Sequence, residues 1–123
     1  MSTLRVTTLA TQAGVEVYTA KAWVNFNGTG TVAIRASGNV SSITDNGTGD
    51  YTVNFTVAMA DANYSFSLSL QRTSTGAQVN QNIVPTINDG VGNVASSSLR
   101  VRAYGSTANT SFDVDIFTVS VFR

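Results

Sequence analysis

The chain has 123 residues, the size of about one domain, and its formal net charge at pH 7 is +0. Only 11% of the residues are charged, below the roughly 25% usual in globular domains. The Lys and Arg residues are scattered along the sequence, whereas a nucleic-acid-binding surface needs clustered basic charge. The composition therefore argues against a nucleic-acid partner.

The chain contains no Cys and no His. Disulfides and thiolate metal sites are thereby excluded, and so are the commonest general base and the usual partner of a catalytic Ser. The N-terminal residues have neither a basic segment followed by an apolar one nor a run of about 20 apolar residues. We therefore expect no signal peptide, no membrane partner and synthesis in a cytoplasm.

Residues 1–14 are expected to form an N-terminal arm or a short strand. Leu4, Val6 and Thr8 lie on one face at a spacing of two, which is the period of a β-strand. Apolar and polar residues alternate again over residues 15–19. The arm therefore leads into a region in which the strand pattern becomes regular.

Residues 15–123 are expected to form one domain, whose first clear strand follows Ala20. Ala22, Val24 and Phe26 share one face of this strand, and Trp23 lies on the other face. Apolar residues on both faces are typical of a strand that is covered on both sides. We therefore expect Trp23 to be covered.

Two further strands and two turns are predicted before residue 51. The Asn27–Gly30 segment breaks the first strand, and Gly28 or Gly30 can adopt the positive φ of a hairpin turn. Alternation over 32–36 predicts the next strand, and the irregular spacing over 39–43 predicts a bulged strand or the entry to a hairpin. The segment DNGTGD at 45–50 is the strongest turn signal in the chain.

The middle of the chain predicts two regular strands and one irregular one. Residues 51–57 and 64–70 alternate cleanly between apolar and polar, as expected for strands with one buried and one solvated face. Residues 59–63 separate them as a loop. The segment 77–98 contains Pro85 and many polar residues, so we expect an irregular edge strand with a loop.

The C-terminal part predicts a strand at 99–103 and a last strand at 112–121. In the last strand the apolar positions shift by one residue at Ile116–Phe117. Such a shift indicates either a β-bulge or a strand that passes from one packing environment to another.

The predicted elements together define the fold class. About eight strands, spaced near ten residues apart and without any amphipathic helix, are typical of a β-sandwich or a jelly roll. We therefore expect an all-β fold, an antiparallel β-sandwich or jelly-roll-like single domain.

Asp113 and Asp115 are the residues that most resemble a catalytic pair. They are two residues apart on one predicted strand face, so their carboxylates could act as an acid and a base. Arg100 and Arg102 have the same spacing, and ion pairs across neighbouring strands or a solvated face explain the pattern more simply. We expect no catalytic residues.

Two other segments carry possible binding chemistry. The loop Asp45–Asp50 could hold calcium through oxygen ligands, but it lacks the ligand spacing of an EF-hand, so a structural turn is favoured. Trp23 could stack against a sugar, with Tyr18 nearby, but a position in the core or in a subunit interface is favoured. We expect no metal site and no cofactor.

The segment AKAWVNFNGTGTVAIRASGNVSSITDNGTGDYTVNFTVAMADANY, residues 20–64, resembles a module that recurs in fibre and other virion proteins of tailed bacteriophages. Its most specific parts are KAWVNFNGTGTV and ITDNGTGDYTVNFT, and the opening MSTLRVTTL resembles the start of short members of this group. The sequence departs from the module at Val57, where Thr is usual, and at Ala60, where Pro is usual.

The resemblance implies a non-enzymatic virion component, commonly a homotrimer, made in the cytoplasm of a bacterial host. Two functions fit. The first is a capsid decoration (cement) protein that binds the major capsid protein or another virion protein, with the N-terminal arm on a neighbouring subunit. The alternative is a receptor-binding knob of a tail or head fibre that recognises a host surface glycan. We favour the first, because the chain contains no coiled coil or shaft.

Overall fold

The computed structural model describes residues 10, 13–14, 17–72, 83–84, 93–105 and 110–123. Within these ranges all regular structure is antiparallel β, which confirms the expected all-β class. The described part has no helix, and therefore none that could cross a membrane. The expected strand at residues 4–9 and the expected edge loop at Pro85 lie outside the described residues.

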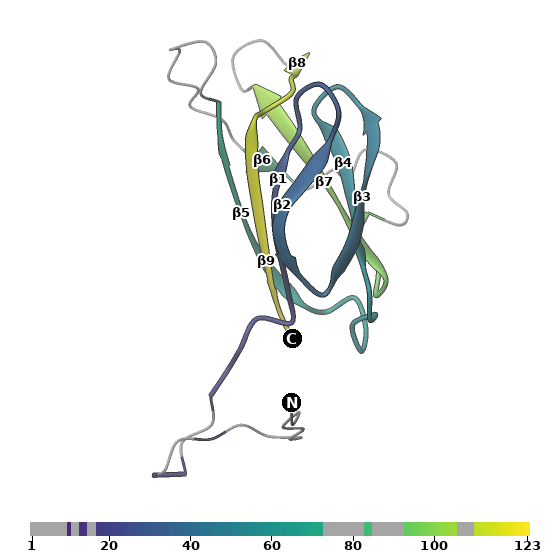
Figure 1. The fold of residues 1–123 in the computed structure, drawn as a ribbon. Coiled ribbons are helices and arrows are strands. Elements are labelled where there is room, and N and C mark those ends of the chain that lie inside the picture. Colours follow the sequence, from purple (N-terminus) through teal and green to yellow (C-terminus); the bar gives the residue numbers. More distant parts are fainter. Residues whose placement is uncertain (1–9, 11–12, 15–16, 73–82, 85–92, 106–109) are drawn as a thin grey trace.

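The strands form two sheets that lie face to face (Figure 1). The order of strands in the first sheet is β2 (Ala33–Gly38), β1 (Ala22–Asn27), β9 (Ile116–Phe122) and β5 (Ser65–Gln71). The order in the second sheet is β3 (Val40–Gly47), β4 (Asp50–Phe55), β7 (Ser98–Gly105) and β6 (Ile83–Val84), with β8 (Thr110–Ser111) paired to β7.

The core lies between the sheets and is built mainly by their central strands. Every second residue of β1, β4, β7 and β9 is buried, because side chains of a strand point alternately to its two faces. The rings of Phe26 and Phe117 stack with centroids 5.2 Å apart, and Tyr51 contacts both rings edge-on. This aromatic cluster joins β1 and β9 of the first sheet to β4 of the second.

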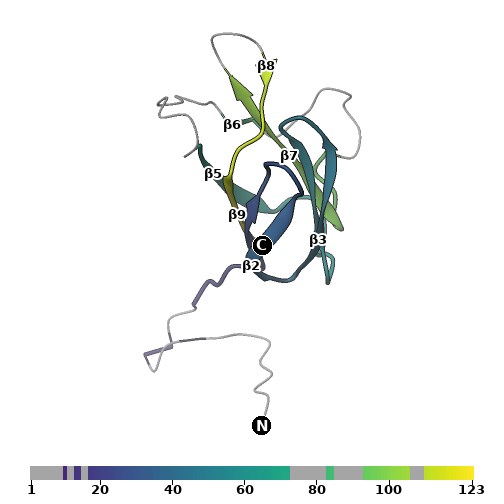
Figure 2. The same cartoon turned by 45° about the horizontal axis from the view of Figure 1, so that its top comes forward.

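The chain enters the first sheet later than the alternating pattern suggests. Residues 17–20 lie outside any strand and are all exposed, and Tyr18 is 80% exposed. They lead out from one end of the two sheets (Figures 1 and 2). Alternation alone was misleading here, because no strand of the described part pairs with residues 17–20.

The irregular spacing predicted at residues 39–43 corresponds to a real irregularity. The register of β3 against β4 shifts between Val40 and Ser42, which confirms a bulged strand. Asn39, just before β3, has a φ of 56°. Its side-chain amide donates to the carbonyls of Lys21 and Val57, at 2.9 and 3.0 Å. Asn39 thus ties the residue before β1 to the segment that follows β4.

The shift in the C-terminal pattern marks the passage of the chain from one sheet to the other. β8 pairs with β7 in the second sheet, whereas β9 pairs with β1 and β5 in the first. The residues between them, 112–115, belong to neither strand. Of the two explanations offered for the shift, the change of packing environment is therefore confirmed.

We predict that Phe117→Ala destabilises the protein by about 3–5 kcal/mol, the usual cost of removing a fully buried Phe ring. Phe117 has an exposed fraction of 0% and contacts both other rings of the aromatic cluster. Phe122→Ala in the same strand is the matched control, because Phe122 is 41% exposed. Urea unfolding followed by circular dichroism measures both, and equal losses would contradict this description of the core.

Candidate functional site

The turn between β3 and β4 is a structural hairpin. The Asp45 carboxylate accepts a hydrogen bond from the Gly47 amide at 3.1 Å, and Gly47 and Gly49 have φ values of 137° and 66°. Positive φ values of this kind favour glycine. The DNGTGD segment therefore has the residues that its backbone conformation requires.

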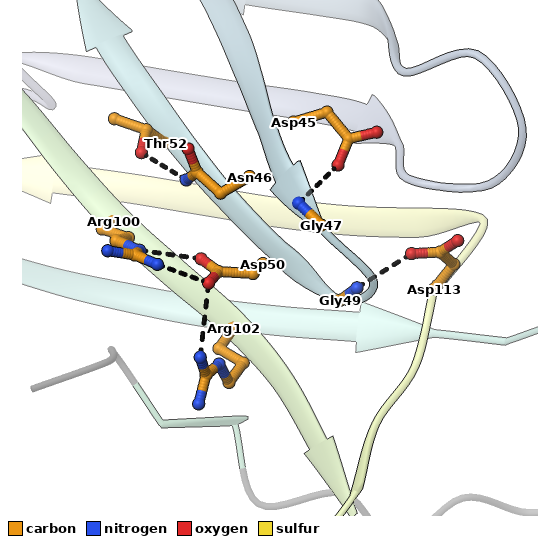
Figure 3. A network of polar contacts seen from close by, with 9 residues as sticks. All are labelled: Asp45, Asn46, Gly47, Gly49, Asp50, Thr52, Arg100, Arg102 and Asp113. Carbon is orange, nitrogen blue, oxygen red and sulfur yellow. Dashed lines mark hydrogen bonds and ion pairs between the residues drawn. The ribbon is translucent and has the colours of Figure 1, made fainter. Parts of the chain in front are cut away.

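The carboxylates around this turn point to different partners and do not converge (Figure 3). Asp45 bonds Gly47, Asp50 bonds two arginines, and Asp113 bonds the Gly49 amide. Among the described residues, no group of three or more acidic side chains is arranged to hold a metal ion. The carboxylates around this turn are thus engaged by groups of the protein itself.

Asp50 is the centre of the largest ionic network in the described structure. Arg100 Nε donates to Asp50 Oδ1 at 2.9 Å and Arg100 Nη2 donates to Oδ2 at 2.6 Å. Arg102 Nη2 lies 3.3 Å from Oδ2. The hydrogen bonds from Arg100 above all, and also those from Arg102, hold the pKa of Asp50 below its ordinary value of 3.8. The Asp50 side chain is only 8% exposed, so this charge depends on its partners.

Of the two explanations given for Asp113 and Asp115, a solvated face or ion pairs with the arginines, the ion pairs are corrected: those that the structure shows for Arg100 and Arg102 are with Asp50. The strand that pairs with β7 here is β4, in a register that places Asp50 opposite Arg102. Asp113 lies in the crossing segment, which forms no strand at this point. Matching spacing misled the prediction because it identifies neither the neighbouring strand nor its register.

Asp113 holds the crossing segment to the hairpin turn. Its Oδ1 accepts a hydrogen bond from the Gly49 amide at 2.8 Å and lies 3.0 Å from the Tyr51 hydroxyl. That hydroxyl also lies 2.8 Å from the Gly28 carbonyl oxygen. Burial, and secondarily the hydrogen bond to Asp113, raises the pKa of Tyr51, so the phenol remains a donor. These contacts assign Asp113 a structural role.

Two glycines allow this close approach of three segments. A Cβ atom at Gly28 would lie 2.3 Å from the Tyr51 hydroxyl oxygen, and one at Gly49 would lie 2.5 Å from the Phe112 carbonyl oxygen. Distances under about 3 Å do not occur for a real Cβ. The Gly28 amide also donates to the Val114 carbonyl at 2.8 Å. Gly28 is thus required for space, whereas Gly30, with a φ of 58°, supplies the positive φ.

Trp23 is not covered, which contradicts the expectation of a strand buried on both faces. Its side chain lies on the outer face of the first sheet and is 43% exposed. The five-membered part of the indole lies over Gly38 of β2, where a Cβ would be 2.3 Å from Nε1. One side of the ring system is therefore held against the sheet. Of the positions considered from the sequence, a place in the core is wrong, and an interface or a sugar platform remains.

The described large apolar residues that are exposed gather at one end of the domain. They are Val17, Tyr18, Trp23, Val57 and Phe122. Val17 and Tyr18 precede β1, Trp23 is its second residue, and Phe122 ends its neighbour β9. Asn39 links Val57 to Lys21 at the same end. We call these five residues the apolar end. Such a group is typical of an interaction surface.

Sequence reasoning missed both Tyr51 and the apolar end. Tyr51 looked like one more buried residue of an alternating strand, although a buried Tyr hydroxyl needs a partner, and this requirement could have marked it. The apolar end could not be found in the same way, because its residues are separated in the sequence and come together only through the pairing of β1, β9 and the Asn39 turn.

Comparison with known proteins gives no further information on the site. The chain matches no family model, no curated protein and no solved structure.

We predict that Asp50→Asn destabilises the protein by about 1.5–3 kcal/mol, the range for hydrogen bonds to charged groups. The amide leaves Arg100 and Arg102 without the carboxylate that they bind. Because the folded state lowers the pKa of Asp50, its contribution is complete above the ordinary value of 3.8 and is lost as the pH falls below that value toward the folded pKa. Urea unfolding of the wild type and of Asp50→Asn, from pH 7 to the lowest pH at which both remain folded, measures this loss.

The matched control is Asp61→Asn, whose ion pair with Arg123 is exposed on both sides. Exposed ion pairs contribute little to stability, so this variant should unfold close to the wild-type midpoint at pH 7. The free energy of unfolding of the wild type should approach that of Asp50→Asn as the pH falls. A difference that stays constant down to the lowest pH measured would contradict the assigned role of the Asp50 carboxylate.

Proposed function

We propose that this chain is a non-enzymatic structural protein of a tailed-bacteriophage virion, and specifically a trimeric decoration protein of the capsid. The observation that carries the proposal is the apolar end, because exposed apolar side chains that gather on one side of a domain are typical of a protein interface. The major capsid protein, or another virion protein at the head surface, is the proposed partner.

The resemblance of residues 20–64 to phage virion modules is the second support for this proposal. Residues 20–64, which carry it, lead into β1 and build β1 to β4, including both tight hairpins. The segment therefore contributes strands to both sheets. One of its departures from the module, Val57, is 68% exposed at the apolar end. An apolar residue where the module usually has Thr makes this end more hydrophobic.

The proposal also includes a jelly-roll-like domain and a homotrimer. The chain changes sheets between β2 and β3, between β4 and β5, between β5 and β6, and again between β8 and β9, and double-sheet jelly rolls have such connections. Residues with uncharged side chains dominate the outer faces, so no strong charge opposes the association of identical copies. A non-enzymatic role agrees with the hydrogen bonds that engage Asp113.

A receptor-binding knob is the second candidate, and Trp23 is the observation that favours it. The indole lies close to Gly38 and remains partly exposed, with Asn25 and Ser120 beside it on the same face. An aromatic surface next to hydroxyl and amide groups suits the apolar face of a sugar ring. In this case the partner would be a host surface glycan.

The copy number of the chain in purified virions distinguishes the two candidates. A decoration protein covers the capsid lattice, so we expect a ratio to the major capsid protein of the order of one, measured by quantitative mass spectrometry with isotope-labelled peptides of both proteins. The tail-tube protein of the same particles serves as an internal standard. A ratio nearer one in a hundred would contradict the decoration role and favour the fibre knob, and absence from the virion would contradict both.

A further inference from the structure

β5 differs from the other edge strands of the two sheets because nothing in it discourages the pairing of another strand. Edge strands are normally protected by bulges, charged residues or short length. β2 has a bulge opposite Asn25–Phe26 and contains Arg35. β3 has two irregularities, and the described part of β6 has only two residues. β5 pairs with β9 over seven consecutive residues without irregularity, and its sequence SFSLSLQ contains no charge, Pro or Gly.

The inner face of β5 is also incompletely covered. Phe66, Leu68 and Leu70 point toward the core but are only half-buried, whereas Val119 and Val121 opposite them on β9 are buried. Among the described strands, β5 has a neighbour in its sheet on one side only. A strand added along the free side would pair the open backbone groups and cover these three side chains, as in β-strand addition.

We infer that the free edge of β5 binds the N-terminal segment Leu4–Leu9 of a second copy of this chain. This inference rests on the trimeric protein proposed above. The segment LRVTTL places Leu4 and Val6 on one face at strand period, and its length is close to that of β5. An added strand would direct these two side chains inward, beside the half-buried residues of β5.

The exposed residues before β1 argue that the acceptor is another copy. The described residues of the 10–20 region are all exposed, and residues 17–20 lead out from the end of the domain (Figures 1 and 2). The eleven residues from Ala10 to Ala20 can span up to about 35–40 Å when extended, enough to reach a neighbouring domain. Each copy then has one donor surface and one acceptor surface, which differ. Such a head-to-tail contact forms a closed trimer when each copy is rotated by one third of a turn relative to the next.

Disulfide trapping tests the contact directly, because the wild-type chain has no Cys. One chain carries Thr7→Cys, on the face of the arm opposite Leu4 and Val6. The other carries Ser67→Cys or Ser69→Cys, both exposed on the outer face of β5, so that two registers are sampled. Facing residues of paired strands lie within disulfide distance. After mixing and mild oxidation, we expect a dimer of one chain of each kind on a non-reducing gel.

The control mixture replaces the β5 variant by Ser42→Cys, which is exposed on the protected edge strand β3. We expect at least a tenfold lower yield of mixed dimer from this pair. Equal yields would overturn the inference. It would also be overturned if a chain carrying both Thr7→Cys and Ser67→Cys closed within itself while the mixture gave no dimer, since the arm would then bind its own domain.

A full-length variant, Leu4→Asp with Val6→Asp, provides a second measurement. In sedimentation velocity we expect loss of the trimer and a shift to the monomer, whereas Thr7→Asp, on the opposite face of the segment, should keep the trimer. A trimer that both variants retain would overturn the arm contact and leave the proposed virion role standing. Trapped mixed dimers from a protein that is absent from virions would instead refute that role and keep the contact.

Discussion

The structure depends on the position of Tyr51, which holds together three segments that are distant in the sequence. Its ring packs against Phe26 and Phe117 in the core, and its hydroxyl reaches Gly28 and Asp113. These contacts fix where the chain crosses from β8 to β9. If the crossing were shifted by one residue, the side chains of β9 that now face the core would point to the outer face of the sheet. The hydrogen bonds of Tyr51, together with the packing of its ring, therefore determine which residues of β9 face the core.

Several of the described charges are engaged by other groups of the protein itself, and many of the remaining polar contacts on the second sheet are between uncharged groups. Arg100 and Arg102 bind Asp50, and Asp113 binds backbone and phenol groups. The outer face of the second sheet is a series of hydrogen bonds between amides and hydroxyls, such as Asn46 to Thr52 and Asn54 to Thr44. Because the net charge is +0, long-range electrostatic steering contributes little to the contacts proposed above.

The sequence predicts the strands better than it predicts their neighbours. Alternation located β4 and β5, and the apolar shift at Ile116–Phe117 correctly indicated a change of environment, because both follow from the strict period of a strand. The partner of Arg100 and the exposure of Trp23 could not be predicted in this way. Spacing along one strand specifies which residues share a face, but strand order and register decide what lies opposite that face. The same limit kept the apolar end hidden until β1 and β9 were paired.

The two surfaces assigned to assembly are contiguous, and this constrains how one copy can use both. Ser65, at the start of β5, pairs with Phe122 of the apolar end. In the proposed ring, the N-terminal arm of one copy occupies the β5 edge of the next copy. One end of that edge lies beside the apolar end. The arm contact depends on backbone pairing, whereas the apolar end offers side chains. In the proposed assembly, copies join one another through β5 while Trp23 and Val57 remain available to the proposed capsid partner, so the two proposed contacts need not compete for the same groups.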